Sequence, residues 1–237
     1  MTYIIGSKCS DGILLLSDSR VTRGYDINED VKILQPIPNV VLAASGVTGI
    51  FTKFVSQLDF RIKSSQIQTW DGLMNLVEDL SVELDQRYRK RVLGTIDVLI
   101  ATKQTEKTAE LYAVGREGLA EEVKKWISIG HGEPYGAPFF KAMWNKDLTM
   151  KENAQLATFV LKIIDHYKLD NSVDSKPQIW YVPFDGDIHQ LTHVETDKIS
   201  HVAFGMYDEL NSKLKSMVRP NEGKLPTKLE KSIDSDD

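Results

Sequence analysis

Three side chains near the N-terminus, those of Thr2, Asp18 and Lys32, could together perform nucleophilic chemistry. Aminopeptidases remove Met1 when the second residue is small, and the mature chain would then carry a hydroxyl and a free α-amine on one residue. Such an amine has a pKa of about 7.7–8.0 and can accept the hydroxyl proton near neutral pH. A nearby lysine would lower the pKa of the hydroxyl or the amine, and a carboxylate would hold that lysine charged. Taken singly, each of the three is an ordinary structural residue.

The segments around these residues are predicted to be strands of one sheet. Apolar runs separated by turn signals mark them, and the second run is apolar throughout, which is typical of a strand buried on both faces. The predicted strands are 3–6, 13–17, 31–34 and 40–44, with a hairpin at Asp11-Gly12 and a loop over 20–30. Because Asp18 follows the second strand and Lys32 lies at the start of the third, both can meet Thr2 at one end of the sheet.

Farther along the chain, the apolar period changes from strand-like to helical and back again. The predicted helices are about 50–62, 73–84, 134–144, 150–167 and 197–214, and the further strands are about 95–101, 110–114, 124–129, 178–182 and 188–191. Runs of strands followed by runs of helices favour an α+β fold, with two stacked sheets and helices on both outer faces. We expect one domain over 1–214 and a charged, disordered tail over 215–237.

Composition narrows the class of protein. The 237 residues carry a net charge of −5, which argues against nucleic-acid binding because that function needs a basic surface. The single cysteine, Cys9, excludes a disulfide within the chain and a cysteine-rich zinc site. No apolar run approaches the roughly 20 residues that span a bilayer, and the N-terminus lacks the features of a signal peptide, so we expect a cytoplasmic protein. His189 and His193 lie in a strand-like region that would keep them apart, so we expect no metal, and the chemistry outlined above needs no organic cofactor.

A series of short motifs resembles the start of a β-subunit of the proteasome family. The motifs are Thr2 to Gly6, Asp11-Gly12, Ser17-Asp18-Ser19-Arg20, Gly24, Lys32-Ile33 and Ala43-Ala44-Ser45-Gly46, followed later by Gly130-x-Gly132 ahead of a predicted helix. Their order and spacing match the family, although the loop before Lys32 is slightly shorter than usual. The resemblance is good to about residue 60 and fair to about residue 190. A start with only Met1 before the threonine is similar to the simpler bacterial relatives of the proteasome.

The resemblance implies a four-layer αββα sandwich and the chemistry of an N-terminal nucleophile (Ntn) hydrolase. Thr2 would be the nucleophile and, through its amine, the general base, while Asp18 and Lys32 would orient and tune it. Three further roles follow from the resemblance: the N–H of Gly46 in the oxyanion hole, Thr22 and Gly46 holding a substrate strand by main-chain hydrogen bonds, and Ala44 at the base of a roomy apolar specificity pocket.

The sequence departs from the family pattern around the serine that assists the terminal amine. His131, in Gly130-His131-Gly132, stands in place of that serine, and a histidine can relay a proton. For the later aspartate followed by a serine, Asp170 with Ser172 fits best, and Asp174 with Ser175 is the second choice.

Three functions remain open at this point. The first is a threonine peptidase that cleaves unfolded polypeptide inside a homo-oligomeric ring or related assembly, with other proteasome-like subunits or an unfoldase as further partners. The second is an Ntn amidase or transpeptidase outside the proteasome proper, which His131 and the missing propeptide favour. The third is a non-catalytic ring subunit, which the presence of both Asp18 and Lys32 disfavours. Neither nucleic acid nor a membrane is an expected partner.

Overall fold

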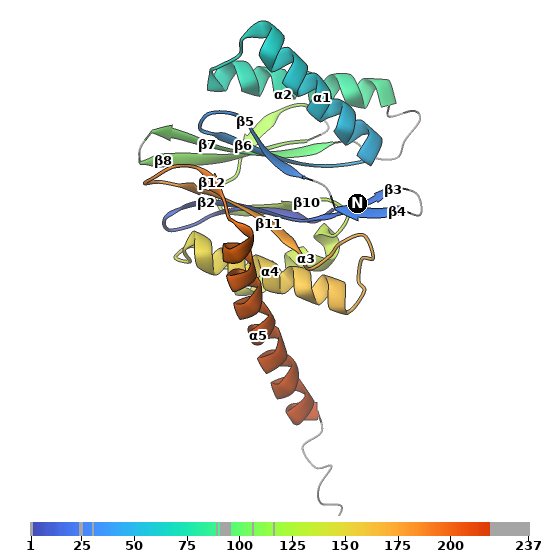
Figure 1. The fold of residues 1–237 in the computed structure, drawn as a ribbon, viewed down its shortest axis with the longest axis vertical. Helices are drawn as coiled ribbons and strands as arrows, with labels where there is room; N and C mark the ends of the chain where they lie inside the picture. The colour runs from blue at the N-terminus through green and yellow to red at the C-terminus, as the bar shows by residue number, and fades with distance from the viewer. Residues whose placement is uncertain are drawn as a thin grey trace, which may run out of the picture.

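Two antiparallel sheets stack face to face and helices cover the outer face of each, so the layers run helix, sheet, sheet, helix (Figure 1). The computed structural model describes residues 2–23, 26–29, 31–88, 90, 96–105, 107–115 and 117–218. The predicted α+β class and the four-layer αββα sandwich are confirmed.

The first sheet carries the N-terminal strands. Its strand order is β10 (Trp126–Ile129), β1 (Ile4–Lys8), β2 (Gly12–Asp18), β11 (Pro177–Pro183) and β12 (His189–Gln190). Every residue of β2 is buried, because Ile13 and Leu15 lie in the core between the sheets while Leu14 and Leu16 lie in the core beneath the helices. This two-residue alternation of a strand covered on both sides explains the continuous apolar run in the sequence.

The second sheet lies on the other side of that central core. Its strand order is β5 (Ile33–Ile37), β6 (Val40–Ser45), β7 (Asp97–Thr105), β8 (Thr108–Val114) and β9 (Ala120–Glu122). Its outer face is covered by α1 (Thr48–Ser65) and α2 (Trp70–Tyr88), whose apolar rows include the buried Phe54, Leu58 and Leu80 (Figure 1).

Three helices lie on the side of the first sheet, namely α3 (Glu133–Met143), α4 (Met150–His166) and α5 (His193–Val218). A capping box between Thr149 and Glu152 starts α4, and the N–H of Met150 donates to Asp11 Oδ1 at 2.7 Å. This bond fixes the start of α4 on the β1–β2 hairpin. None of the helices in the described part of the chain is long and apolar enough to span a membrane.

The prediction of a loop over 20–30 is wrong. Two short strands, β3 (Arg20–Arg23) and β4 (Asp26–Glu29), pair as an antiparallel ribbon there. The ribbon has no apolar run of the kind that marks a strand buried on both faces, so the sequence pattern missed it. The short strand β9, rich in glutamate, was missed for the same reason.

Three element boundaries also differ from the prediction. β5 begins at Ile33, so Lys32 lies just before the strand rather than within it, and Pro36 lies inside β5 where its pairing with β6 is irregular. α5 starts at His193 and continues to Val218, past the predicted end at 214. The rest of the predicted tail, 219–237, lies outside the described residues.

Candidate active site

Asp18 lies at the end of β2 and is the centre of a buried polar cluster. Its Oδ1 accepts the N–H of Tyr3 at 2.8 Å and also contacts the Lys32 ammonium at 2.8 Å, while Oδ2 accepts the N–H of Arg20 at 3.2 Å. The register of β1 and β2 pairs Ile4 with Ser17, which sets the residues before Ile4 beside Asp18. Since the Tyr3 N–H belongs to the peptide bond after Thr2, the structure brings together the three residues predicted to converge.

Burial sets the protonation of this carboxyl. Asp18 is fully buried, and its desolvation raises the pKa to about 6, although the Lys32 ammonium and the Tyr3 N–H both act to lower it. A pKa of about 6 still leaves Asp18 ionised at neutral pH, opposite a Lys32 side chain that is only 2 % exposed. The pair is therefore an ion pair almost entirely removed from water.

This shift predicts how the stability of the protein changes with pH. The pKa of Asp18 is about 6 when folded and about 3.9 when unfolded, so over this interval the folded state binds the proton more tightly. The free energy of unfolding of the wild type, relative to Asp18→Asn, should therefore decrease as the pH rises from about 4 to about 6. Urea unfolding of both proteins at several pH values measures this difference, and a difference that grows with pH would contradict the raised pKa.

The backbone of Thr2 is held by the loop that follows β10. The Thr2 carbonyl oxygen accepts the N–H of Gly132 at 3.1 Å, and Thr2 itself is 6 % exposed. Gly130 has a φ of 100°, and a Cβ placed on it would lie 2.3 Å from the Thr2 oxygen and 3.5 Å from Ser45 Cβ. Thr2 and the end of β6, which Gly46 follows, are therefore neighbours across Gly130.

Replacing Gly130 by alanine should damage the fold and the position of Thr2 together. The φ is left-handed and the added methyl group would overlap a backbone oxygen, so we expect a loss of about 2–4 kcal/mol in the free energy of unfolding. Gly115→Ala is the matched control, because a Cβ there has no neighbour within 4 Å among the described residues. Equal melting temperatures for the two variants would show that Gly130 and the Thr2 carbonyl oxygen are not as close as described.

His131, Asp170 and Ser172 form a second cluster. His131 Nδ1 lies 2.8 Å from Asp170 Oδ2, and Asp170 Oδ1 accepts both the N–H of Ser172 at 2.8 Å and its hydroxyl at 2.5 Å. Burial acts to raise the pKa of Asp170, but the hydrogen bonds from Ser172 and His131 outweigh it and hold this pKa below its usual value. The Gly132 N–H that binds the Thr2 carbonyl belongs to the peptide bond directly after His131. This second cluster therefore lies next to the cluster around Asp18.

The second-choice pair, Asp174 and Ser175, has other partners. Asp174 accepts the N–H and the hydroxyl of Ser19 at 3.1 and 3.0 Å, and the hydroxyl of Ser175 donates to Asp165 at 2.9 Å. Asp174 thereby holds the residue that follows Asp18.

The predicted substrate-binding residues lie around the second sheet and the ribbon. Ala44 is buried in β6 among the core residues under α1 and α2, and its N–H donates to the Lys32 carbonyl at 3.2 Å. Gly46 directly follows β6. Thr22 lies in β3, opposite Ile27, and its side chain is outside the described part of the chain.

Two positioning residues were not predicted from the sequence. Gln178 on β11 accepts the backbone N–H of Lys32 through its Oε1 at 3.0 Å, and so ties the segment before β5 to the other sheet. Arg20 donates through Nη1 to the carbonyls of Asn171 and Val173 at 2.9 and 3.2 Å, and so holds the segment that carries Asp170. Both contacts join residues about 150 positions apart, so no local pattern could have indicated them.

The two histidines considered as metal ligands lie in different elements. His189 is in β12 and His193 begins α5. Within the described residues, no group of three or more His, Cys, Asp or Glu side chains is arranged to hold a metal ion.

Comparisons with known proteins identify the family to which the sequence is similar. The model of the family described as "Proteasome subunit" matches residues 2–182. The chain is 28 % identical over 166 residues to a proteasome subunit beta of Nanoarchaeum equitans, which covers 68 % of this chain and 84 % of that relative. It is 25 % identical over 177 residues to a proteasome subunit alpha of Methanococcus maripaludis, covering 72 % of this chain and 67 % of the relative.

Solved structures extend the likeness in fold to nearly the whole chain. Anbu (ancestral beta-subunit) from Yersinia bercovieri superimposes with a TM-score of 0.73 at 17 % identity, covering 94 % of this chain and all of that one. Anbu from Hyphomicrobium sp. strain MC1 gives a TM-score of 0.70 at 16 % identity with the same coverage. These structures confirm the predicted fold, and the family match over residues 2–182 makes it the sandwich of the proteasome type.

Proposed function

The chain belongs to the proteasome subunit family, and we propose that it is a catalytic member, a threonine peptidase that cleaves polypeptides through Thr2 after removal of Met1. Its relatives include both beta and alpha subunits, so membership of the family alone does not decide between a catalytic and a non-catalytic subunit.

The observation that most directly favours catalysis is that one carboxylate oxygen of Asp18 contacts two groups at once. That oxygen binds the Tyr3 N–H and the Lys32 ammonium, both at 2.8 Å, and so holds a buried positive charge beside the proposed nucleophile. A buried ion pair is weak evidence for stability, because apolar residues of similar volume are often as stable or more so. Its presence next to Thr2 therefore fits a role in chemistry.

In the proposed reaction, the α-amine of Thr2 takes the proton of the Thr2 hydroxyl, and the oxygen attacks the carbonyl carbon of a peptide bond. The N–H of Gly46 stabilises the oxyanion that forms. The C–N bond then breaks, the proton passes from the amine to the leaving nitrogen, and an ester remains on Thr2. Water, losing a proton to the same amine, hydrolyses the ester and restores the hydroxyl. The ammonium of Lys32 favours the ionised hydroxyl and the neutral amine.

We assign His131, Asp170 and Ser172 to the support of that amine. Asp170 fixes the ring of His131 through Nδ1, and the proposed role of Nε2 is to exchange a proton with the amine by way of water. The link between Gly132 and the Thr2 carbonyl keeps this cluster next to the residue it serves.

Substrate and assembly complete the proposal. A polypeptide would bind as an extended strand along the backbone of Thr22 and Gly46, with Ala44 at the base of the specificity pocket. Members of this family form ring assemblies, and we propose a homo-oligomeric ring or related assembly, with other proteasome-like subunits or an unfoldase as partners. We also propose a cytoplasmic location, which agrees with the single, buried thiol of Cys9.

The test is the intact mass of the purified protein with and without a peptide epoxyketone, which bonds to both the hydroxyl and the amine of an N-terminal threonine. We expect loss of Met1 and one adduct per chain. A trimmed chain without an adduct, or a chain that keeps Met1, would contradict the proposal. An adduct together with turnover of small amides but not of casein would favour the amidase alternative.

A further inference from the structure

Four lysines surround a hollow at the end of β1 that lies away from Thr2. The hollow is formed where the end of β1, the segment before β10 and the turn after α3 meet, and it has a volume of about 510 Å³. Sites for small ligands usually measure about 300–1,000 Å³. We call it the lysine hollow, and its lining includes Lys8, Lys124, Lys125, Trp144, Asn145 and Lys146.

Hydrogen bonds fix the three segments of the lysine hollow against one another. The N–H of Lys8 donates to the carbonyl of Lys125 at 2.7 Å, and the indole N–H of Trp144 donates to the hydroxyl of Ser7 at 3.0 Å. The backbone that carries the lysines is therefore in place before a ligand binds, which lowers the entropy cost of binding.

The charge of the lysine hollow is strongly positive. Glu122 pairs with Lys8 at 3.0 Å and also with Lys124, and so it balances one of the four positive charges. Among the residues that the structure describes, the ammonium groups of Lys125 and Lys146 have neither an ion pair nor a hydrogen bond. Two cations of the lining thus remain for a ligand.

The uncharged part of the lining also suits an anion. Asn145 Oδ1 accepts the N–H of Asp147 at 3.2 Å, which leaves the NH₂ group of Asn145 as a further hydrogen-bond donor. Trp144 is half-buried and adds aromatic surface to the wall.

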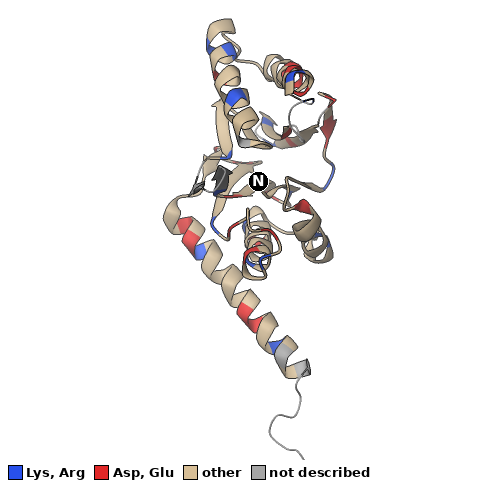
Figure 2. Cartoon of the chain, turned by 90° about the vertical axis from the view of Figure 1, so that its right-hand side faces the viewer, with Lys and Arg blue, Asp and Glu red and all other residues tan. Residues whose placement is uncertain are grey.

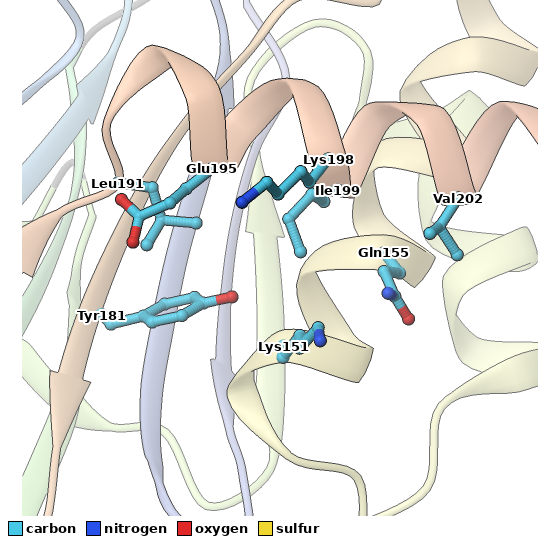
Figure 3. Close-up of a pocket in the computed structure, with 8 residues that line it drawn as sticks. All are labelled: Lys151, Gln155, Tyr181, Leu191, Glu195, Lys198, Ile199 and Val202. Carbon is cyan, nitrogen blue, oxygen red and sulfur yellow. The ribbon is translucent and has the colours of Figure 1, made fainter.

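Other parts of the surface mix the two signs of charge. Figure 2 shows acidic and basic bands following one another along α5. The cavity between α4, α5 and β11 carries Glu195 together with Lys151 and Lys198 (Figure 3). In a chain with a net charge of −5, the lysine hollow is a local excess of positive charge, whose groups repel one another when no anion is bound.

We propose that the lysine hollow binds a polyphosphate anion, inorganic or carried by a nucleotide. An ammonium group is a compact point charge that suits phosphate oxygens, whereas bidentate recognition of a carboxylate usually employs arginine, and none of the described lining residues is an arginine. Because the ammonium groups come from three segments to one compact space, they fit a small ligand with several charges better than an extended acidic chain.

This site is separate from the proposed active site. β1 runs from Ile4 to Lys8 at about 3.3 Å per residue, so the lysine hollow lies about 20 Å from Thr2. The proposal therefore does not rest on the proposed catalytic activity.

Lysine footprinting of the full-length wild-type protein tests the site without any substitution. Lysines are acetylated with N-hydroxysuccinimide acetate, with and without inorganic tripolyphosphate, and the modified peptides are quantified by mass spectrometry. We expect several-fold slower acetylation of Lys125 and Lys146 when tripolyphosphate is present. Lys63 on α1, whose side chain is 74 % exposed, should react at an unchanged rate. Protection of the hollow that is absent, or no greater than that of Lys63, would overturn the proposal.

Calorimetric titration with tripolyphosphate gives an independent measurement. Lys125→Gln combined with Lys146→Gln should weaken binding at least about tenfold, because each ammonium group lost removes a charge-assisted hydrogen bond to the ligand. Neither ammonium group has a partner among the described residues, so this variant should fold normally. Lys63→Gln combined with Lys107→Gln removes the same charge at two other exposed sites and is the matched control. Equal affinities of the two double variants would assign any binding to overall charge and disprove the site.

Two further ligands define the chemistry of the anion. Tighter binding of adenosine triphosphate without Mg²⁺ than of tripolyphosphate would identify a nucleotide as the ligand, and the reverse order would identify an inorganic polyphosphate. Hexaglutamate is the competing acidic chain. Tighter binding of hexaglutamate than of tripolyphosphate would overturn the proposal in favour of an acidic peptide.

Discussion

Replacing Thr2 by alanine is expected to abolish both peptide hydrolysis and labelling by the epoxyketone. The hydroxyl is the proposed nucleophile, and removal of a nucleophile that acts as part of a unit lowers kcat by a factor of the order of 10⁶. Alanine is small enough for Met1 to be removed, so the amine remains and only the hydroxyl is lost. Initial rates on a fluorogenic peptide, together with the mass of the treated protein, measure the effect.

The control for this prediction is Thr2→Ser, which keeps the hydroxyl and should retain both labelling and measurable turnover. Neither change should unfold the protein, because both replacement side chains are smaller than threonine and the hydrogen bond from Gly132 is accepted by the Thr2 backbone carbonyl, which both variants keep. Melting temperatures of both variants should therefore lie close to that of the wild type. Turnover by a well-folded Thr2→Ala protein that is free of contaminating peptidase would disprove the N-terminal mechanism.

The sequence predicts best those elements in which the spacing of apolar residues matches the face that the element buries. β2 is apolar at every core position, and the four-residue recurrences of α1, α2 and α4 match the faces that these helices bury. In these elements local periodicity and burial agree, so the layers and the α+β class could be predicted. The β3–β4 ribbon lies outside the two stacked sheets, and its polar sequence carries no such signal.

The candidate site could be predicted only in part, for a related reason. Thr2, Asp18 and Lys32 lie within a short stretch of sequence whose strands are easy to recognise, so their convergence could be inferred. Gln178 and the loop around Asp170 come from far along the chain, and their contacts depend on how β11 pairs with β2. That pairing is a property of the whole fold. The resemblance to a family selected Asp170 over Asp174, which the local pattern could not do.

Replacing Lys32 by methionine is expected to lower the rate of hydrolysis by a factor of about 10²–10⁴, in the range for the loss of one group that assists proton transfer. Without the ammonium, the pKa of the Thr2 hydroxyl and that of its amine both rise, and fewer chains hold the reactive form at neutral pH. The same change leaves Asp18 buried without its cation, which costs about 3–5 kcal/mol. A fall in activity of the single variant could therefore reflect partial unfolding.

The double variant Asp18→Asn with Lys32→Met separates these two effects. It removes both charges, so most of the free energy of unfolding lost in Lys32→Met should return, since an uncharged pair carries little desolvation cost. Activity should not return, because the ammonium beside Thr2 is still absent. Urea unfolding and the rate of epoxyketone labelling, measured on the wild type and both variants, give the two quantities side by side. If stability and labelling recovered together, the Asp18–Lys32 pair would be structural and Lys32 would have no part in activating Thr2.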